Sequence, residues 1–199
     1  AERATDWRGN NNIAESIIEQ LAREPHPQPA WIVCGAGTGG TSATIGRSLR
    51  YRGLPTRLCV AEPAGGSFAV GWRDRDPRAV ASRATLVEGI GRPKAEPGLV
   101  FDVADAVVEI EDVDSIAAMR LLESVLGRRY GGSSGTNLAA CMHLAQAMQA
   151  HGETGSIITL LCDRGERYAE TLFDDAWLAA HGIDPVRSQA QLSSRLLAT

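Results

Sequence analysis

The feature that most constrains this chain is a glycine-rich turn between an apolar segment and a helical segment. Residues 30–34 have the apolar character of a strand, residues 35–40 include four glycines, and residues 42–52 are predicted to form a helix. The N–H groups at a helix start are unpaired and carry partial positive charge, so such a turn binds anions well. A phosphorylated ligand is therefore predicted here, with Thr38 and Thr41 as hydroxyl donors.

The segments around this turn alternate between strand and helix character. Further strands are predicted at 56–61, 85–87, 106–110 and 156–161, the last being the most apolar and expected at the centre of the sheet. Helices are predicted at 14–23, 115–126, 136–150 and 167–181. Residues 62–83 are expected to form a long loop, and residues 186–199 a polar tail. This order predicts an α/β domain whose mostly parallel sheet is flanked by helices.

The composition narrows the possible partners. The net charge of −4 gives no reason to expect binding to nucleic acid or to an anionic membrane. No apolar run reaches the roughly 20 residues that a membrane span needs. The four cysteines are scattered, with no CxxC pair, and a secretory signal pattern is absent, so reduced thiols in a cytoplasmic protein are predicted. The four histidines share no ligand spacing, and no metal site is predicted.

The glycine turn taken alone leaves two interpretations open. Gly35, Gly37 and Gly40 satisfy the G-x-G-x-x-G pattern of a dinucleotide fold, and Glu62 ends the next predicted strand, where a ribose-binding acid would lie. An NAD-binding Rossmann domain of an oxidoreductase is therefore one hypothesis. A nucleoside triphosphate P-loop is not indicated, because the turn lacks the Gly-Lys-Ser/Thr ending.

A second glycine-serine turn, at residues 131–137, also precedes a predicted helix. Together with residues 37–41, 89–91 and 161–168, its order and spacing resemble the fold type II pyridoxal-phosphate enzymes, the cysteine synthase and cystathionine β-synthase family. The resemblance implies the large, C-terminal domain of the tryptophan synthase β-like architecture. Residues 4–12 and 87–93 are most similar to a bacterial branch of cysteine synthases and L-cysteine desulfhydrases.

The resemblance assigns roles to particular residues. The turn that holds the phosphate of pyridoxal 5'-phosphate in the family is matched without a gap by Gly37, Thr38, Gly39, Gly40 and Thr41. The serine that hydrogen-bonds the pyridine nitrogen corresponds to Ser133, with Ser134 as the alternative. The segment beside the cofactor and the substrate amine corresponds to Gly89, Ile90 and Gly91.

One element of the family pattern is not matched. The family lysine that forms the Schiff base lies in a smaller N-terminal domain, upstream of the phosphate turn, whereas residues 1–36 contain no lysine. The single lysine, Lys94, matches no family position, so no catalytic residue is assigned in this chain. Residues 1–185 are therefore expected to be the cofactor-binding large domain of a longer enzyme, inactive in isolation.

The family resemblance also implies a reaction. We expect β-elimination or β-replacement on a small amino acid, either L-cysteine or O-acetylserine, with the L-cysteine desulfhydrase reaction favoured over cysteine synthesis. A homodimer is the family expectation for the assembly. Because the substrate loop of the family is not matched, the residues of this chain do not identify the leaving group.

Overall fold

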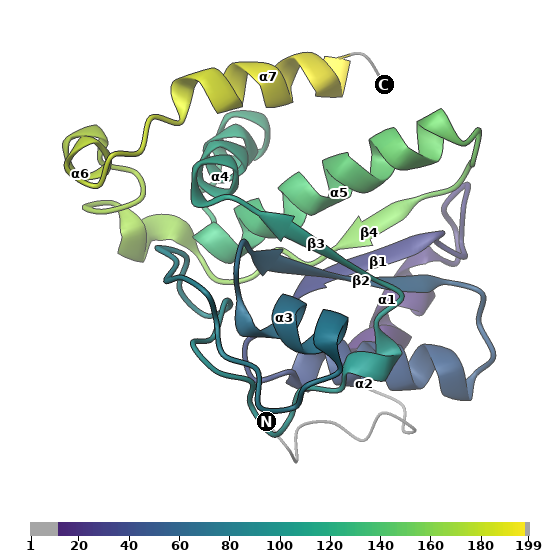
Figure 1. The fold of residues 1–199 in the computed structure, drawn as a ribbon. Helices are drawn as coiled ribbons and strands as arrows, with labels where there is room; N and C mark the ends of the chain where they lie inside the picture. The colour runs from purple at the N-terminus through teal and green to yellow at the C-terminus, as the bar shows by residue number, and fades with distance from the viewer. Residues whose placement is uncertain (1–11, 198–199) are drawn as a thin grey trace.

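A four-stranded parallel sheet forms the centre of the protein (Figure 1). The computed structural model describes residues 12–197. The strands are β1 (Trp31–Gly35), β2 (Arg57–Pro63), β3 (Ala106–Ile110) and β4 (Ile157–Thr159), and they lie in the order β3-β2-β1-β4. In the register, Val33 of β1 pairs with Cys59 of β2 and with Thr159 of β4. The predicted parallel α/β sheet is therefore confirmed.

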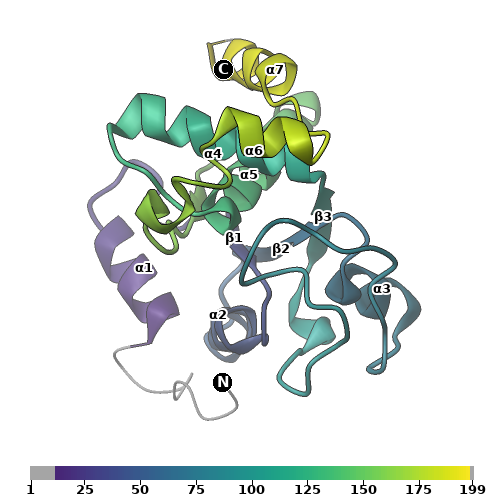
Figure 2. The same cartoon turned by 90° about the vertical axis from the view of Figure 1, so that its left-hand side faces the viewer.

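Helices cover both faces of this sheet (Figures 1 and 2). The helices on one face are α4 (Asp112–Leu126), α5 (Gly132–Ala150) and α7 (Val186–Leu197). Those on the other face are α1 (Ile13–Leu21), α2 (Gly40–Tyr51) and α3 (Ser67–Asp74). The short helix α6 (Asp175–Ala180) and two 3-10 turns, η1 (Phe101–Val103) and η2 (Gly165–Tyr168), complete the described elements. The arrangement is a three-layer α/β/α fold.

The sequence of β1 is apolar throughout because both of its faces are covered. Trp31 and Val33 join the cluster that contains residues of α4 and α5, whereas Ile32 and Cys34 pack with α1 and α2. Such continuous apolar runs are expected for strands of a parallel sheet with helices on both sides. The four cysteines are free thiols, and burial raises the pKa of Cys34 to about 12.

Helices α4 and α5 approach each other unusually closely. A Cβ atom added to Gly135 of α5 would lie 2.0 Å from the backbone oxygen of Ser115 in α4. Beside it, the Thr136 hydroxyl donates to the Ser115 hydroxyl at 2.8 Å. The small residues at the start of α5 thus allow the two helices to pack directly, which fixes where α5 begins relative to the sheet.

Several predicted elements differ from the structure in its first half. Residues 62–83 contain helix α3 rather than a loop throughout, because the Glu62 carboxylate accepts the Phe68 N–H in the first turn of a segment with little helix propensity of its own. Residues 85–87 form no strand; Asp112 holds Thr85 and Leu86 instead. Helix α2 starts at Gly40, two residues earlier than predicted.

The second half also departs from prediction. Strand β4 is confined to Ile157–Thr159 and lies at an edge of the sheet, not at its centre. Helix α5 starts at Gly132, and the helix predicted over 167–181 is divided into η2 and α6. The residues predicted as a polar tail include helix α7, which packs on α4, with Leu192 buried and the Ser188 hydroxyl bonded to Asp114. Whether residues 1–185 form one domain of a longer enzyme stays a prediction.

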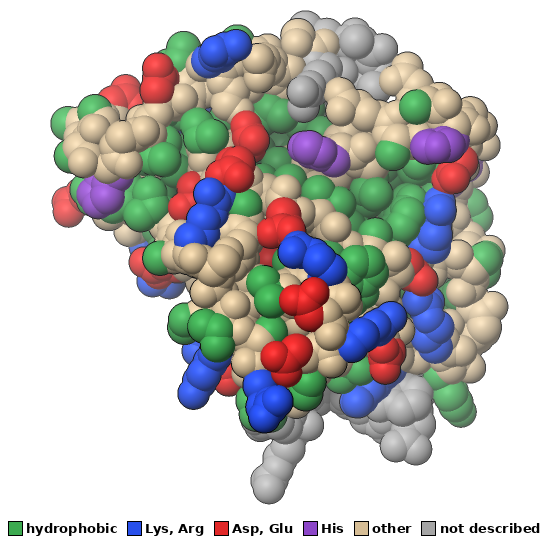
Figure 3. All heavy atoms as spheres, viewed as in Figure 1, with side chains coloured by type: hydrophobic (Ala, Val, Ile, Leu, Met, Phe, Trp, Pro, Cys, Tyr) green, Lys and Arg blue, Asp and Glu red, His purple; other side chains and the backbone are tan. Residues whose placement is uncertain are grey.

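Charged side chains of both signs are interspersed on the face shown in Figure 3. Many of them form exposed ion pairs, such as Arg73 with Glu109 at 2.6 Å and Arg75 with Asp102 at 2.6 Å. Exposed pairs of this kind contribute little to stability, typically below about 1 kcal/mol each. Within residues 12–197, no helix combines the length and the hydrophobicity needed to cross a lipid bilayer.

Candidate functional site

A cavity of about 630 Å³ lies where β1 and β4 end. Its walls come from the turn before α2, the turn at residues 88–90, the start of α5 and the segment after β4. Most of the predicted site residues line it, namely Gly37, Thr38, Gly39, Gly40, Thr41, Gly89, Ile90 and Ser133. Gly91 does not: it lines a neighbouring cavity with other residues of the segment 80–93, and its place beside the cofactor and substrate stays a prediction.

The start of α2 has the geometry of an anion site. Gly39, the residue before the helix, has a φ of +88°, and no side chain caps the helix start. Thr38 and Thr41 are exposed and line the cavity. A Cβ atom on Gly37 would lie 2.2 Å from the Gly89 oxygen, and one on Gly39 would lie 2.5 Å from the Gly98 oxygen. The turn therefore requires glycine at both positions, and its N–H groups remain available to a ligand.

The start of α5 distinguishes the two candidate serines. The Ser134 side chain is fully buried, and its oxygen accepts the Cys162 N–H at 2.8 Å. Ser133 lines the cavity and is 7% exposed. Among the residues that the structure describes, none is hydrogen-bonded to the Ser133 hydroxyl. The geometry thus leaves Ser133, not Ser134, free to meet a ligand, while its bond to a pyridine nitrogen stays a prediction.

The two ends of the cavity differ in electrostatic character. Asp163 lines it beside the start of α5: its Oδ1 atom lies 2.2 Å from where a Cβ on Gly131 would be. The Tyr168 hydroxyl donates to the other oxygen of Asp163 at 2.7 Å. The first turn of α2 contains no acidic residue. Glu88 and Arg167 also line the cavity and form an ion pair with each other, and Arg167 lies 3.9 Å from Asp163. The uncapped start of α2 is therefore the part of the cavity that favours the anionic end of a ligand.

One cavity residue, Asn137, was not assigned from the sequence, whereas Cys162 belongs to the segment 161–168 that carried the family resemblance. Asn137 donates through Nδ2 to the Leu160 oxygen at 3.1 Å, and its buried Oδ1 has no partner within the described part of the chain. Cys162 is the exposed thiol among the four cysteines and also lines the cavity. Asn137 lies four residues after Ser133 on the same helix, a spacing that places both residues on one face. This spacing could have identified Asn137 from the sequence.

Glu62 does not occupy the position that the dinucleotide hypothesis requires. Its side chain is fully buried under α3, where it accepts the Phe68 N–H at 3.1 Å, and it does not line the cavity. Burial raises the pKa of this carboxyl to about 8. A ribose-binding acid has to reach its ligand, so the structure does not support the Rossmann alternative.

Lys94 also lies away from the cavity. It is exposed and forms an isolated antiparallel bridge with Val80. It is absent from the residues that line the cavity. The chain's single lysine is therefore not placed to reach a ligand bound there.

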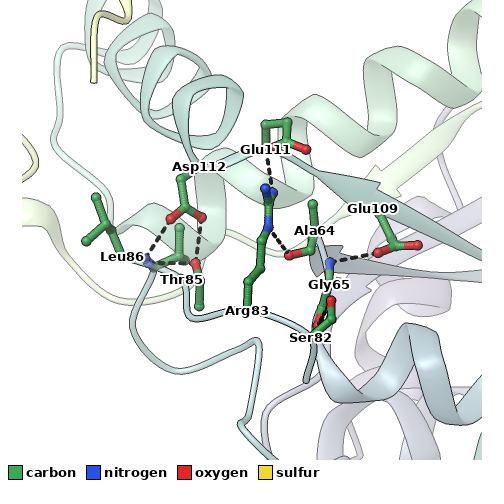
Figure 4. Close-up of polar contacts among 10 residues, drawn as sticks. Ala64, Gly65, Ser82, Arg83, Thr85, Leu86, Glu109, Glu111 and Asp112 are labelled. Carbon is green, nitrogen blue, oxygen red and sulfur yellow. Dashed lines mark hydrogen bonds and ion pairs between the residues drawn. The ribbon is translucent and has the colours of Figure 1, made fainter. Parts of the chain in front are cut away.

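A set of polar contacts ties residues 82–86 to the carboxyl ends of β2 and β3 (Figure 4). Arg83 donates to the Ala64 oxygen at 2.7 Å and forms an ion pair with Glu111. Asp112 accepts from the Thr85 hydroxyl at 2.6 Å and from the Leu86 N–H at 2.7 Å. These contacts fix the chain just before the turn at 88–90, so they determine how that turn meets the cavity.

Comparison with known proteins defines the class. The family model described as pyridoxal-phosphate dependent enzyme matches residues 2–163. The chain therefore belongs to the family of pyridoxal-phosphate dependent enzymes. The predicted membership is confirmed, although the similarity noted for residues 4–11 lies outside the described residues.

Particular relatives refine this assignment. The chain is 52% identical over 192 residues to L-cysteine desulfhydrase Cds1 of Mycobacterium tuberculosis (strain ATCC 25177 / H37Ra), covering 96% of this chain and 52% of that protein. It is 37% identical over 167 residues to N-(2-amino-2-carboxyethyl)-L-glutamate synthase of Cupriavidus metallidurans, covering 83% of this chain and 45% of the relative. The chain thus spans about half the length of the curated relatives it matches.

The fold is shared with solved structures of known enzymes. The crystal structure of O-acetylserine sulfhydrylase isoform 3 from Entamoeba histolytica aligns with a TM-score of 0.69 and 24% identity, covering 92% of this chain and 48% of that one. At this identity the similarity shows the fold alone. It confirms the predicted fold type II α/β architecture.

Proposed function

We propose that this chain forms the cofactor-binding part of an enzyme that carries out β-elimination or β-replacement on a small amino acid. L-cysteine desulfhydrase activity is the favoured reaction, with cysteine synthesis from O-acetylserine as the second candidate, because the chain is 52% identical to a desulfhydrase. The observation that carries the proposal is one cavity lined both by the glycine turn at 37–41 and by Ser133.

The residues present fit pyridoxal 5'-phosphate. The uncapped start of α2, with its exposed threonines, offers N–H and O–H donors to the phosphate dianion. A volume of about 630 Å³ is within the range of small-molecule sites. The cofactor is therefore proposed to lie with its phosphate at α2 and its ring toward α5.

Ser133 is proposed to meet the ring nitrogen. When bound, the cofactor supplies an electron sink that weakens the bonds at the α-carbon of the amino acid. A serine hydroxyl bonds the nitrogen without holding a proton on it, as an aspartate would, so the sink stays mild. This suits the loss of a β-substituent better than a reaction that needs a long-lived carbanion. The partnerless Oδ1 of Asn137 is one further acceptor in the same cavity.

This chain is proposed to bind and orient the cofactor rather than to supply the amine that bonds to it. Lys94 is exposed and outside the cavity, so the proton at the α-carbon has no lysine acceptor among the lining residues. We expect the 199-residue chain by itself to form no borohydride-reducible cofactor adduct at Lys94. Such an adduct, detected by peptide mass spectrometry, would contradict the assignment.

Two expectations about the protein, its cellular location and its assembly, complete the proposal. A cytoplasmic location is proposed from the four free thiols, two of them fully buried. A homodimer is proposed from the family resemblance alone.

Cofactor binding is tested by thermal unfolding of the chain with pyridoxal 5'-phosphate or with NAD. A ligand that binds only the folded state stabilises it by RT ln(1 + c/Kd), where c is the free ligand concentration, so Tm rises as c exceeds Kd. We expect a rise with pyridoxal 5'-phosphate, a smaller rise in Thr38→Ala, and an unchanged rise in Thr154→Ala, whose threonine lies in a different cavity. Stabilisation by NAD and not by pyridoxal 5'-phosphate would overturn the proposal.

The reaction is tested on an enzyme that contains this chain and an amine for the cofactor. Sulfide and pyruvate formed from L-cysteine identify the desulfhydrase, and cysteine formed from O-acetylserine and sulfide identifies the synthase. If a preparation that binds the cofactor forms neither product, both reactions are excluded.

A further inference from the structure

Cys162 is the exposed thiol among the four cysteines, and it lines the cavity. Cys34 also lines the cavity but is 1% exposed, Cys59 is buried, and Cys141 is partly buried. Burial raises the pKa of each of these three thiols to about 12, so they hold almost no thiolate near pH 8. Since the thiolate is the reactive form of cysteine, covalent chemistry of this chain is expected at the accessible sulfur.

Hydrogen bonds hold Cys162 against the start of α5. Its N–H donates to the Ser134 hydroxyl oxygen at 2.8 Å, in the first turn of the helix. Its Sγ atom lies 3.8 Å from Asn137 Nδ2 and 3.8 Å from the Leu160 oxygen. The sulfur therefore has a defined place at the α5 end of the cavity.

The side-chain amide of Asn137 lacks one partner beside this sulfur. Asn137 is fully buried, lines the cavity and donates through Nδ2 to the Leu160 oxygen at 3.1 Å. A carbonyl oxygen can only accept, so this bond fixes which end of the amide is Nδ2 and which is Oδ1. Oδ1 is buried and has no partner among the described residues. Such an acceptor is costly unless a ligand supplies a donor, so the orphaned oxygen points to a ligand with an N–H or O–H group.

The Oδ1 atom of Asn137 is within reach of a group attached to Cys162. Standard bond lengths place the two polar atoms of one amide about 2.2 Å apart, so Oδ1 lies within about 6 Å of Sγ. A half-disulfide with its donor atom two carbons beyond the sulfur spans about 4–5 Å from Sγ to that donor. A hydrogen bond of about 2.9 Å then covers the remaining distance.

The charges of the cavity are compatible with a positively charged donor. Among the described residues that line it, Glu88, Asp163 and Arg167 are charged, so carboxylates outnumber the guanidinium. Arg167 forms its ion pair with Glu88 at 2.7 Å and lies 3.9 Å from Asp163. Asp163, which directly follows Cys162 in the chain, is thus the less closely paired of the two carboxylates. An ammonium group beside Cys162 is favoured over a second carboxylate.

We propose that Cys162 is a site of reversible modification by small disulfides that carry an ammonium group, that Asn137 Oδ1 accepts a hydrogen bond from this group, and that the modification blocks the cavity. The Cys162 thiolate attacks one sulfur of the small disulfide, so that a new S–S bond forms and the original one breaks. The electron pair of the broken bond leaves with the released half, which is reduced to a thiol. The proton that this half takes up balances the one that Cys162 lost to solvent.

The modification is tested on the 199-residue chain without cofactor, with cystamine at pH 8 and mass spectrometry of the intact chain and its peptides. We expect one half-disulfide per chain, located on Cys162 and removed by dithiothreitol. Cys162→Ser is expected to take up none, whereas the matched control Cys141→Ser keeps the uptake of the wild type. An unmodified wild type, or equal modification of another cysteine, would overturn the proposal. The modified peptide is identified in the wild type, so this result holds even if a variant does not fold.

The role of Asn137 is measured by comparing cystamine with bis(2-hydroxyethyl) disulfide, whose half has the same length but no charge. Each equilibrium constant for exchange is divided by that of glutathione with the same disulfide. A charged donor makes a hydrogen bond about twice as strong as a neutral one, so the wild type should favour cystamine about fivefold. Asn137→Ala should reduce this preference to below about twofold.

Two results would contradict the role of Asn137. Equal constants for the two disulfides in the wild type would show that the ammonium group is not recognised. A preference that persists in Asn137→Ala would assign it to the carboxylates of the cavity. If Asn137→Ala does not fold, the side-chain carbonyl ¹³C signal of Asn137 in the wild type decides, because it has to shift more with the cystamine half than with the hydroxyethyl half.

The effect on the cofactor rests on the proposed function and is measured separately. The hydroxyethyl half-disulfide is used, because it carries no amine that could bond to the cofactor. A group on Cys162 occupies the end of the cavity proposed for the ring, so the Kd of pyridoxal 5'-phosphate should rise at least about tenfold and recover with dithiothreitol. An unchanged Kd would refute the blocking of the cavity. Failure of the unmodified chain to bind the cofactor, with the exchange at Cys162 intact, would refute the proposed function and not the modification site.

Discussion

The buried acid Glu62 should make the stability of the chain depend on pH in a calculable way. Its pKa rises from 4.5 in the unfolded chain to about 8 in the fold. Between these values the unfolded state is ionised while the folded state keeps its proton, so the free energy of unfolding falls as pH rises. One pH unit of difference is worth about 1.4 kcal/mol. Glu62→Gln has no carboxyl to ionise at this position. The free energy of unfolding of the variant should therefore rise relative to that of the wild type by roughly 3–5 kcal/mol between pH 5 and pH 8.5.

Urea denaturation of both proteins at pH 5, 6, 7 and 8.5 measures this difference directly. Other titrating groups are common to the two proteins and cancel in the comparison. The dependence of the free energy on urea should be the same for both, because the surface exposed on unfolding does not change. Two stability curves that run parallel from pH 5 to pH 8.5 would refute the reasoning, since they would mean that Glu62 ionises normally in the fold.

Three further predictions concern the start of α5. Ser134→Ala should lower the free energy of unfolding by about 1–2 kcal/mol, because the Cys162 N–H loses its acceptor. Ser133→Ala should change the free energy of unfolding by less than about 0.5 kcal/mol but weaken cofactor binding about fivefold. Urea denaturation and cofactor titration measure the two effects, and equal effects of the two variants would contradict the assignment. Gly135→Ala should lower the free energy of unfolding by about 2–3 kcal/mol, because its Cβ would lie 2.0 Å from the Ser115 oxygen. An unchanged midpoint in urea denaturation would show that α4 and α5 can move apart without loss of stability.

The parts of the site that could be predicted are those that the sequence encodes locally. The turn before α2 needs glycine at 37 and 39, where the backbone passes within contact distance of other loops, and this requirement is visible as a glycine run. The same holds for the small residues at the start of α5. The family pattern added Gly89 and Ile90 because their spacing from the glycine turn could be matched to a known order.

The remaining features depend on contacts between distant segments. Ser133 and Ser134 are equivalent as sequence, and only the bond from the Cys162 N–H to Ser134 separates them. Helix α3 was missed because its first turn is stabilised by Glu62 from a preceding strand, not by its own residues. The place of β4 was wrong because an apolar run indicates a strand but not how many strands pair with it, and β4 is in fact only partly buried.

Strand β4 forms one edge of the sheet within the described part of the chain. It pairs with β1 alone among the described residues, and Ile157 and Ile158 are only partly buried. The backbone groups on its outer side can therefore accept any extended segment that reaches them, whether from the same protein, a second copy or a misfolded neighbour. The yield of properly folded chain should consequently fall as its concentration during refolding is raised, and a proline or a charged residue on this strand should counteract that loss.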